Sequence, residues 1–138
     1  MVSERLRKLA RLARLSADHE SQRVAEARQA CERELARRAQ LEERLTAPVV
    51  DAEPGALAMQ GRWVEATAQA IQGSVAKSKG LEKAAEDARA AAARAHGRKL
   101  ATERAHGAAL TEARERRLEQ DAQALDNLTL LRRPPRNR

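Results

Sequence analysis

The sequence has no Phe and no Tyr, a single Trp (Trp63), a single Ile (Ile71) and a single Cys (Cys31). Strands favour β-branched and aromatic side chains, so their scarcity argues against a β-sheet. It also argues against a large globular core, because burial stabilises a fold in proportion to its apolar area. A single cysteine forms no internal disulfide, which favours a reducing compartment and predicts a cytoplasmic location.

Prolines are few and clustered. Pro48, Pro54 and Gly55 share one short stretch, and Pro134 and Pro135 lie near the C-terminus. Proline breaks helix interiors, so these residues mark helix boundaries. The sequence predicts a single coiled-coil domain over 1–138, with a helix at about 3–47, a bend at about 48–56, a second helix at about 57–131 and a basic tail at 132–138.

The residues that are abundant are Ala, Leu, Arg, Glu, Lys and Gln, the strong helix formers. A short link between two long helices makes them antiparallel neighbours. The predicted fold class is therefore all-α, with two long helices forming an antiparallel coiled-coil hairpin.

Apolar residues recur in steps of three and four along both predicted helices, with several slips. The predicted seam of the first helix contains Leu6, Leu9, Ala13, Ala17, Val24, Ala27, Cys31, Leu35, Ala39, Leu41 and Leu45, with Glu20 filling one position. That of the second contains Val64, Ala68, Ile71, Val75, Leu81, Ala84 or Ala85, Ala88, Ala92, Ala95, Leu110, Leu118, Ala122, Leu125 and Leu128. Much of this seam is alanine, so we expect a marginally stable hairpin. Glycines at 73, 80, 97 and 107 indicate local flexibility or close packing, and less readily a hinge.

The formal net charge of +7 and the pI of about 10.6 favour an acidic partner. However, residues 1–48 mix eleven basic with eight acidic groups. Such mixing is typical of a solvated helix with many ion pairs, and it argues against one uniform polyanion-binding face.

No pattern in the sequence indicates catalysis or a bound metal. There is no phosphate loop, nucleophile–base arrangement or paired ligand spacing. His19, His96 and His106 are predicted to be solvated, and Cys31 to be an inert thiol on the seam. A two-helix hairpin also offers no pocket that would shift pKa values. We therefore predict a protein that is not an enzyme and has no cofactor.

Two regions near the chain ends are candidates for binding partners. Arg7, Arg11 and Arg14 share one face of the first helix, beside leucines that lie off the seam; a frayed helix end and a docking surface both explain this pattern. Near the C-terminus, leucines including Leu118 and Leu125 are denser than one stripe needs, and a basic tail follows. In a hairpin these two regions are expected to meet at one tip, suited to a groove or pore in a partner.

The bend carries a third candidate surface, formed by Leu57, Met59 and Trp63. Tryptophan is enriched in binding hot spots, which favours an interaction anchor. A residue that caps the hairpin explains Trp63 slightly better.

The chain resembles the FliJ family of flagellar type III export proteins and their injectisome counterparts. The similarity is strongest over Glu115–Asn127, since the family ends similarly, with a charged Glu/Gln/Lys run, then Leu or Met, then Asp-Glu, then arginines. The N-terminal stretch Arg5–Leu12 and the pair Arg62-Trp63 after the bend are also similar.

The resemblance implies the central stalk of the export ATPase, with the termini-bearing end in the pore of the hexameric ATPase. The bend would face the cytoplasmic domain of the membrane export gate. Export chaperones are a further implied class of partner, and the chain would be peripherally membrane-associated. The residues expected at the ring are Arg7, Arg11, Arg14, Leu118, Leu125, Arg132 and Arg133. Those expected toward the gate are Leu57, Met59 and Trp63.

Two other functions stay open at this point. A basic coiled coil that binds nucleic acid or ribosomes fits the pI and the arginine tail, although stacking aromatics are absent and no nucleic acid is expected. A structural scaffold that dimerises through its thin seam is the second.

Overall fold

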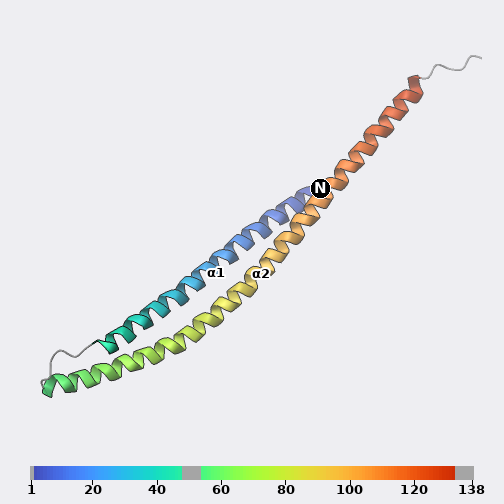
Figure 1. Ribbon diagram of the computed structural model, residues 1–138. Helices are drawn as coiled ribbons and strands as arrows, with labels where there is room; N and C mark the ends of the chain where they lie inside the picture. Colours follow the sequence, from blue (N-terminus) through green and yellow to red (C-terminus); the bar gives the residue numbers. More distant parts are fainter. Residues whose placement is uncertain (1, 48–53, 133–138) are drawn as a thin grey trace, which may run out of the picture. The chain divides into compact units, whose positions relative to one another are not determined.

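The computed structural model describes residues 2–47 and 54–132, except for the side chains of residues 54, 56 and 57. Two α-helices account for nearly all of this part: α1, Val2–Thr46, and α2, Pro54–Arg132 (Figure 1). The predicted all-α class is confirmed, and the two helices pack as an antiparallel hairpin.

The helix ends follow local rules. Proline is accepted at the first position of a helix, where its missing N–H is unpaired anyway, so Pro54 begins α2 instead of lying in the bend. Glu4 lies in the first turn of α1 and Arg44 in its last turn. Arg132 lies in the last turn of α2. Each of these charges opposes the partial charge of the helix dipole at that end.

Contacts divide the chain into two compact units. Unit 1 contains Met1–Ser16 and His96–Arg138, and unit 2 contains Ala17–Ala95. The prediction of one domain over the whole chain stays a prediction, and the units are described one at a time.

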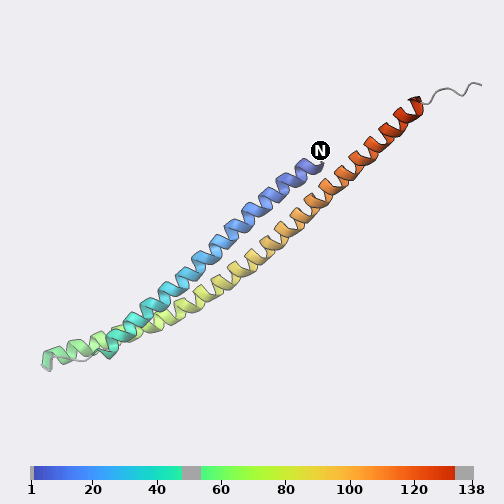
Figure 2. The ribbon, with the colours of Figure 1, turned by 45° about the horizontal axis from the view of Figure 1, so that its top comes forward.

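In unit 2, the α1 and α2 segments run side by side in opposite directions (Figures 1 and 2). Buried and half-buried positions follow alternating steps of three and four on both helices, which is the spacing of a coiled-coil heptad. On α1 they include Ala17, Glu20, Val24, Ala27, Cys31, Glu34, Arg38, Leu41 and Leu45. On α2 they include Thr67, Ile71, Ser74, Ser78, Leu81, Ala85, Ala88, Ala92 and Ala95.

The predicted seam is wrong at several positions. Leu9, Leu35, Val75 and Leu110 are exposed, and so is Ala39. The slips that these residues implied do not occur, because the regular heptad continues through polar residues. Small and polar side chains, not the nearest leucine, fill the seam at those turns.

The seam of unit 2 is rich in alanine. Its buried apolar residues are Ala17, Ala85, Ala88 and Ala95, and no large side chain of the described residues is fully buried. Alanine lets the two backbones approach closely but removes little apolar area from water, at about 25 cal/mol per Å². Packing therefore stabilises this hairpin only weakly.

In unit 1, the first turns of α1 pack against α2. Half-buried positions include Ser3, Leu6, Ala10 and Ala13 on α1, and Lys99, Thr102, His106 and Ala109 on α2. His106 thus lies on the seam, contrary to the prediction that it is solvated, because its heptad position faces α1. His19 and His96 are exposed, as predicted.

The glycines of α2 do not mark close helix contacts. A Cβ built on any of them has no atom within 4 Å outside the local helix, and none has a positive φ. The close-packing interpretation is therefore wrong, whereas local flexibility, and less readily a hinge, stay predictions for these positions.

Candidate functional site

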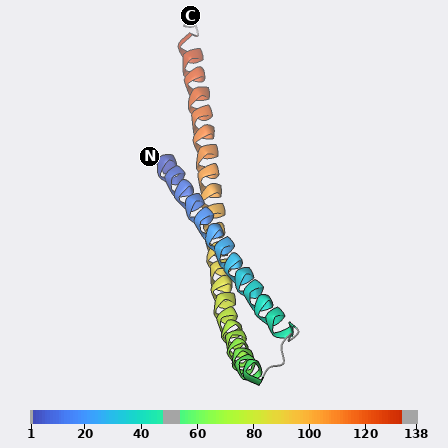
Figure 3. The ribbon, with the colours of Figure 1, turned by 90° about the vertical axis from the view of Figure 1, so that its left-hand side faces the viewer.

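The C-terminal part of α2 extends beyond α1 in unit 1. Val2 and Ser3 line a surface groove with Ala109, Glu112, Ala113 and Arg116, so α1 ends beside this stretch of α2. From residue 117 to Arg132, α2 continues without α1 beside it (Figure 3). We call residues 117–132 the overhang. At 1.5 Å per residue it is about 24 Å long.

Leucines of the overhang are strongly exposed. Leu118 is 62% and Leu125 65% exposed, and Leu128, Leu130 and Leu131 are also exposed. Leu118, Ala122, Leu125 and Leu128 are spaced by four, three and three residues, so they share one helix face. Contiguous exposed apolar faces of this kind mark sites of interaction.

This apolar face is not a continuation of the seam. The heptad that faces α1 passes from Ala109 through Ala113 and Arg116 to Gln120, Gln123 and Asn127. These side chains are polar after Ala113, and they lie on the side of the helix opposite Leu118 and Leu125. Leu118 and Leu125 therefore point away from the side on which α1 packs, whereas Leu130 continues the heptad on that side.

The first helix presents a basic outer surface in unit 1. Arg7, Arg11 and Arg14 are all exposed and share one face of α1, as predicted. Leu9, Leu12 and Leu15 lie off the seam and are also exposed. The described members of the predicted ring-binding set are thus accessible in this unit.

The two leucine- and arginine-rich ends were expected to meet at one tip, and this expectation is wrong. In unit 1 they are staggered along α2, because α1 ends beside Glu112–Arg116 and the overhang begins after it. The physical reason is the unequal length of the helices, 45 residues for α1 and 79 for α2.

The residues predicted at the bend are only partly described. Met59 and Trp63 lie on the first turns of α2 in unit 2, with exposures of 73% and 44%. The Thr67 hydroxyl donates to the Trp63 carbonyl oxygen at 2.7 Å, a bond within the helix. The side chain of Leu57 and all of Arg133 lie outside the described residues. Arg132 is the last residue of α2 and is exposed.

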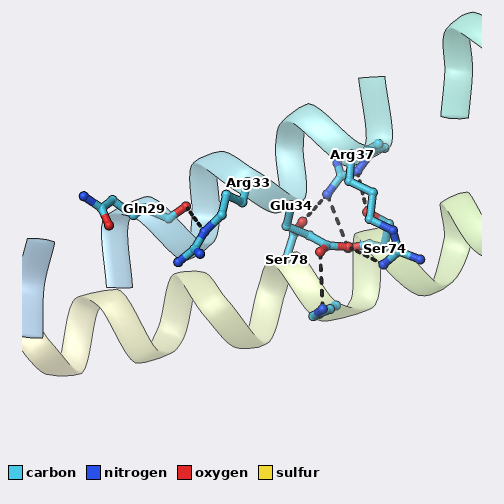
Figure 4. A network of polar contacts seen from close by, with 8 residues as sticks. Gln29, Arg33, Glu34, Arg37, Ser74 and Ser78 are labelled. Carbon is cyan, nitrogen blue, oxygen red and sulfur yellow. Dashed lines mark hydrogen bonds and ion pairs between the residues drawn. The ribbon is translucent and has the colours of Figure 1, made fainter. Parts of the chain in front are cut away.

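A polar cluster on the seam of unit 2 was not predicted. Arg38 of α1 donates to the Ser74 hydroxyl and to the Ser74 carbonyl oxygen, each at 3.4 Å, and also to the Ser78 hydroxyl. One guanidinium of α1 thereby contacts two successive turns of α2. Figure 4 shows the network of polar contacts around Glu34, Ser74 and Ser78. Ser74 and Ser78 are both buried. We call Glu34, Arg38, Ser74, Lys77 and Ser78 the polar cluster.

Glu34 adds an ionic contact to the polar cluster. Its carboxylate lies 3.4 Å from the Lys77 ammonium across the seam and 3.6 Å from the Arg37 guanidinium on its own helix. A hydrogen bond with Ser74, followed by the contacts with Lys77 and Arg37, lowers the pKa of Glu34 below its ordinary value, although burial opposes this. Glu34 Oε1 has no hydrogen-bond partner. The carboxylate is therefore held in its charged form, although one of its two oxygens is buried without a hydrogen bond.

Two kinds of site are absent from the part of the chain that the structure describes. In residues 2–47 and 54–132, no three His, Cys, Asp or Glu side chains lie close enough to share a metal ion. Within the same residues, neither helix combines the length and the apolar character needed to cross a bilayer. What the described surface offers is a pair of long helical faces with exposed leucines and charges.

Comparisons with known proteins return no relative. No family model, characterised protein or solved structure matches this chain.

Proposed function

We propose that this chain is the central stalk and coupling component of a type III protein export ATPase complex, of the flagellar or injectisome kind. It acts by binding other proteins and catalyses no reaction itself. Its partners are the hexameric export ATPase and the cytoplasmic domain of the export gate, with export chaperones as a further class. It works in the cytoplasm, at the membrane only through the export apparatus.

The observation that carries the proposal is the overhang. A single helix with exposed Leu118 and Leu125, ending in Arg132, is narrow enough to enter a pore that excludes a thicker domain. Its apolar face gives area to bury against a ring. The basic face of Arg7, Arg11 and Arg14 lies on the part of unit 1 where α1 and α2 run together, which is thicker than the overhang. This face would attract acidic loops at the mouth of such a pore.

The bend end is the natural candidate for the second partner. Met59 and Trp63 are accessible on the first turns of α2. An aromatic residue that is partly exposed at a helix end is the kind of side chain that anchors an interface. A stalk needs two separate binding surfaces, and the sequence concentrates exposed apolar residues in these two regions.

The test is the ATP turnover of the purified hexameric ATPase with and without this chain. We expect binding and raised turnover. The variant Arg11→Glu with Arg14→Glu should lose most of the stimulation, because two charges are reversed at the proposed contact. The matched control, Arg33→Glu with Arg44→Glu, reverses two exposed arginines of unit 2 and should stimulate like the wild type.

Two results would count against the stalk. Absence of ATPase binding at low salt would remove it as the leading function. Retention of random DNA by the chain, with an affinity that falls steeply as salt rises, would then favour the nucleic-acid alternative. Equal loss of stimulation in both double variants would show that charge in general, and not the face of Arg11 and Arg14, governs the effect.

A further inference from the structure

Two large apolar side chains are exposed in the middle of unit 2. Leu35 of α1 is 52% exposed and Val75 of α2 is 38% exposed. The other exposed large apolar side chains in the described part of unit 2 lie near the bend, on the first turns of α2. Leu35 directly follows the buried Glu34, and Val75 directly follows the buried Ser74, so both occupy the same position of the heptad.

Leu35 and Val75 also lie on the same side of the hairpin. Glu34 contacts Arg37 on its own helix and Lys77 on the other, which places both basic residues on one side of the seam. In an antiparallel pair of helices, the heptad position of Leu35 and Val75 lies on the opposite side of the seam. The contact between Glu34 and Lys77 further shows that Leu35 and Val75 are nearly level along the two helices.

The same side of unit 2 carries nine charged residues, all of them exposed. They are Asp18, Arg28, Glu32 and Glu42 on α1, and Glu65, Lys79, Glu82, Glu86 and Arg89 on α2. We call these nine residues, with Leu35 and Val75, the Leu35 side. Counted along both helices from Leu35 and Val75, Arg28 is level with Glu82, and Glu32 is level with Lys79. The other five charged residues are each level with an uncharged residue of the opposite helix.

The Leu35 side is left without a partner by the hairpin that carries it. Arg28 pairs with Glu32 of its own helix at 3.6 Å, and not with α2. Within the described residues, Lys79 and Glu82 form no ion pair. The centre of this side is therefore an apolar patch with two pairs of opposite charges beside it, all open to another molecule.

We propose that the Leu35 side binds the Leu35 side of a second copy of this chain, about a two-fold axis parallel to the helices. Such an axis places α1 of each copy opposite α2 of the other, and it keeps every residue at its own level. Residues that are level within one hairpin therefore face each other between the two copies. The facing pairs are Leu35 with Val75, Arg28 with Glu82, and Glu32 with Lys79, and each pair forms twice.

The charges favour this axis over a two-fold axis across the helices. The second arrangement would place α1 against α1 and α2 against α2, and it would bring Glu65 of one copy opposite Glu86 of the other. Like charges that face each other oppose association. With the axis parallel to the helices, no charge of the Leu35 side is level with a like charge. Each helix then has only antiparallel neighbours, as in many four-helix bundles.

This inference does not rest on the proposed function, and it uses residues of unit 2 alone. It does bear on the bend, because two parallel copies would carry Met59 and Trp63 at the same end of the paired units. A partner of the bend would then meet two such surfaces together, which raises avidity without a new contact. The experiment below uses the chain alone, so its result is independent of binding to the ATPase.

The test is a charge exchange followed by sedimentation equilibrium at low salt. Variant one is Arg28→Glu with Glu32→Arg, and variant two is Lys79→Glu with Glu82→Lys. Both keep the net charge of the chain. Each variant alone would place like charges in both contacts of the dimer. A mixed dimer of the two variants restores opposite charges in both contacts between the copies, but not within either hairpin, so mixing separates association from hairpin stability.

Two controls complete the design. Glu26→Arg with Arg33→Glu exchanges two exposed charges on the other side of α1 and should associate like the wild type. Leu35→Gln with Val75→Gln keeps every charge and removes the apolar centre, so it should weaken association. Circular dichroism checks that each variant is as helical as the wild type.

We expect the wild type to approach twice its 15.2 kDa mass as concentration rises. Each charge variant alone should associate at least about tenfold more weakly, because four facing pairs become repulsive in each dimer. The equimolar mixture should recover the wild-type affinity. In 1 M salt, where the screening length is about 3 Å, the difference between the wild type and each variant should shrink.

Three outcomes would overturn the proposal. A wild type that stays at 15.2 kDa at every concentration has no such contact. Charge variants that associate as strongly as the wild type would place the contact elsewhere, as in the scaffold that dimerises through its seam. Weak association of both variants with no recovery on mixing would show that these charges do not face each other about an axis parallel to the helices.

Discussion

Replacing Arg38 with alanine should destabilise the hairpin of unit 2. The substitution removes three hydrogen bonds across the seam and leaves the buried hydroxyls of Ser74 and Ser78 without this donor. Bonds to a charged group contribute about 1.5–3 kcal/mol each, but ordering a long side chain costs up to about 2 kcal/mol. Since Arg38 is only half-buried, we expect a net loss of about 1–3 kcal/mol in the free energy of unfolding.

The measurement is urea unfolding followed by circular dichroism, with Arg33→Ala as the matched control. Arg33 is exposed and donates only within its own helix, to the Gln29 carbonyl oxygen at 3.4 Å. Its loss should change the free energy of unfolding by less than about 0.5 kcal/mol. The two variants remove the same side chain five residues apart on α1 and differ in the contact across the seam.

A triple variant separates lost bonds from lost packing. Arg38→Leu with Ser74→Ala and Ser78→Ala replaces donor and acceptors together by apolar groups, which is often neutral or stabilising. We expect it to recover most of the stability that Arg38→Ala loses. If Arg38→Ala is as stable as Arg33→Ala, the polar cluster does not hold the seam. If the triple variant is the least stable of all, burial of the aliphatic stem of Arg38 contributes more to the free energy of unfolding than its hydrogen bonds do.

Three further predictions concern unfolding by urea. Because contacts lower the pKa of Glu34, its stabilisation is present above about pH 4.5 and is lost as pH falls through the lowered pKa; wild type should therefore lose more stability than Glu34→Gln between pH 7 and pH 3, and equal losses would contradict this. Gly80→Ala with Gly97→Ala should raise the free energy of unfolding by about 1–2 kcal/mol, since each site has open space and helical backbone; no gain would mean that these glycines are strained in a way the helix does not show. Ala88→Leu should cost about 1–3 kcal/mol by overpacking the seam, whereas Ala90→Leu on the exposed side should be nearly neutral; equal effects would refute the assigned faces.

The fold was predictable from the sequence because breakers and helix formers act locally. Pro48 and Pro54 bracket the bend, and alanine, glutamate and arginine favour helix on both sides of it. The register was not predictable in the same way. Leu9 and Leu35 each lie one position off the heptad, so a seam traced through the largest apolar residues departs from the register at Ala10 and Glu34.

The polar cluster could have been predicted from the heptad spacing of the sequence alone. Strict alternation of three and four residues from Ala17 to Leu45 passes through Glu34 and Arg38. The same alternation in α2 passes through Ser74 and Ser78. Oppositely placed polar residues on two heptads predict a polar layer. The stagger of the ends was also implicit, since the breakers already make the second helix much longer than the first.

The overhang has a consequence for how this chain orders itself. Isolated helices shorter than about 12–15 residues are marginal in water, mainly because the first turn is costly to form. The overhang is only slightly longer, but its first turn is supplied by the paired part of α2 before it. Its residues should therefore fray progressively from Arg132 inward instead of melting as a unit, with amide exchange fastest at the C-terminal end. A partner that binds Leu125 or Leu128 would contact a helix that is already partly formed. Its binding would then order only the last turns.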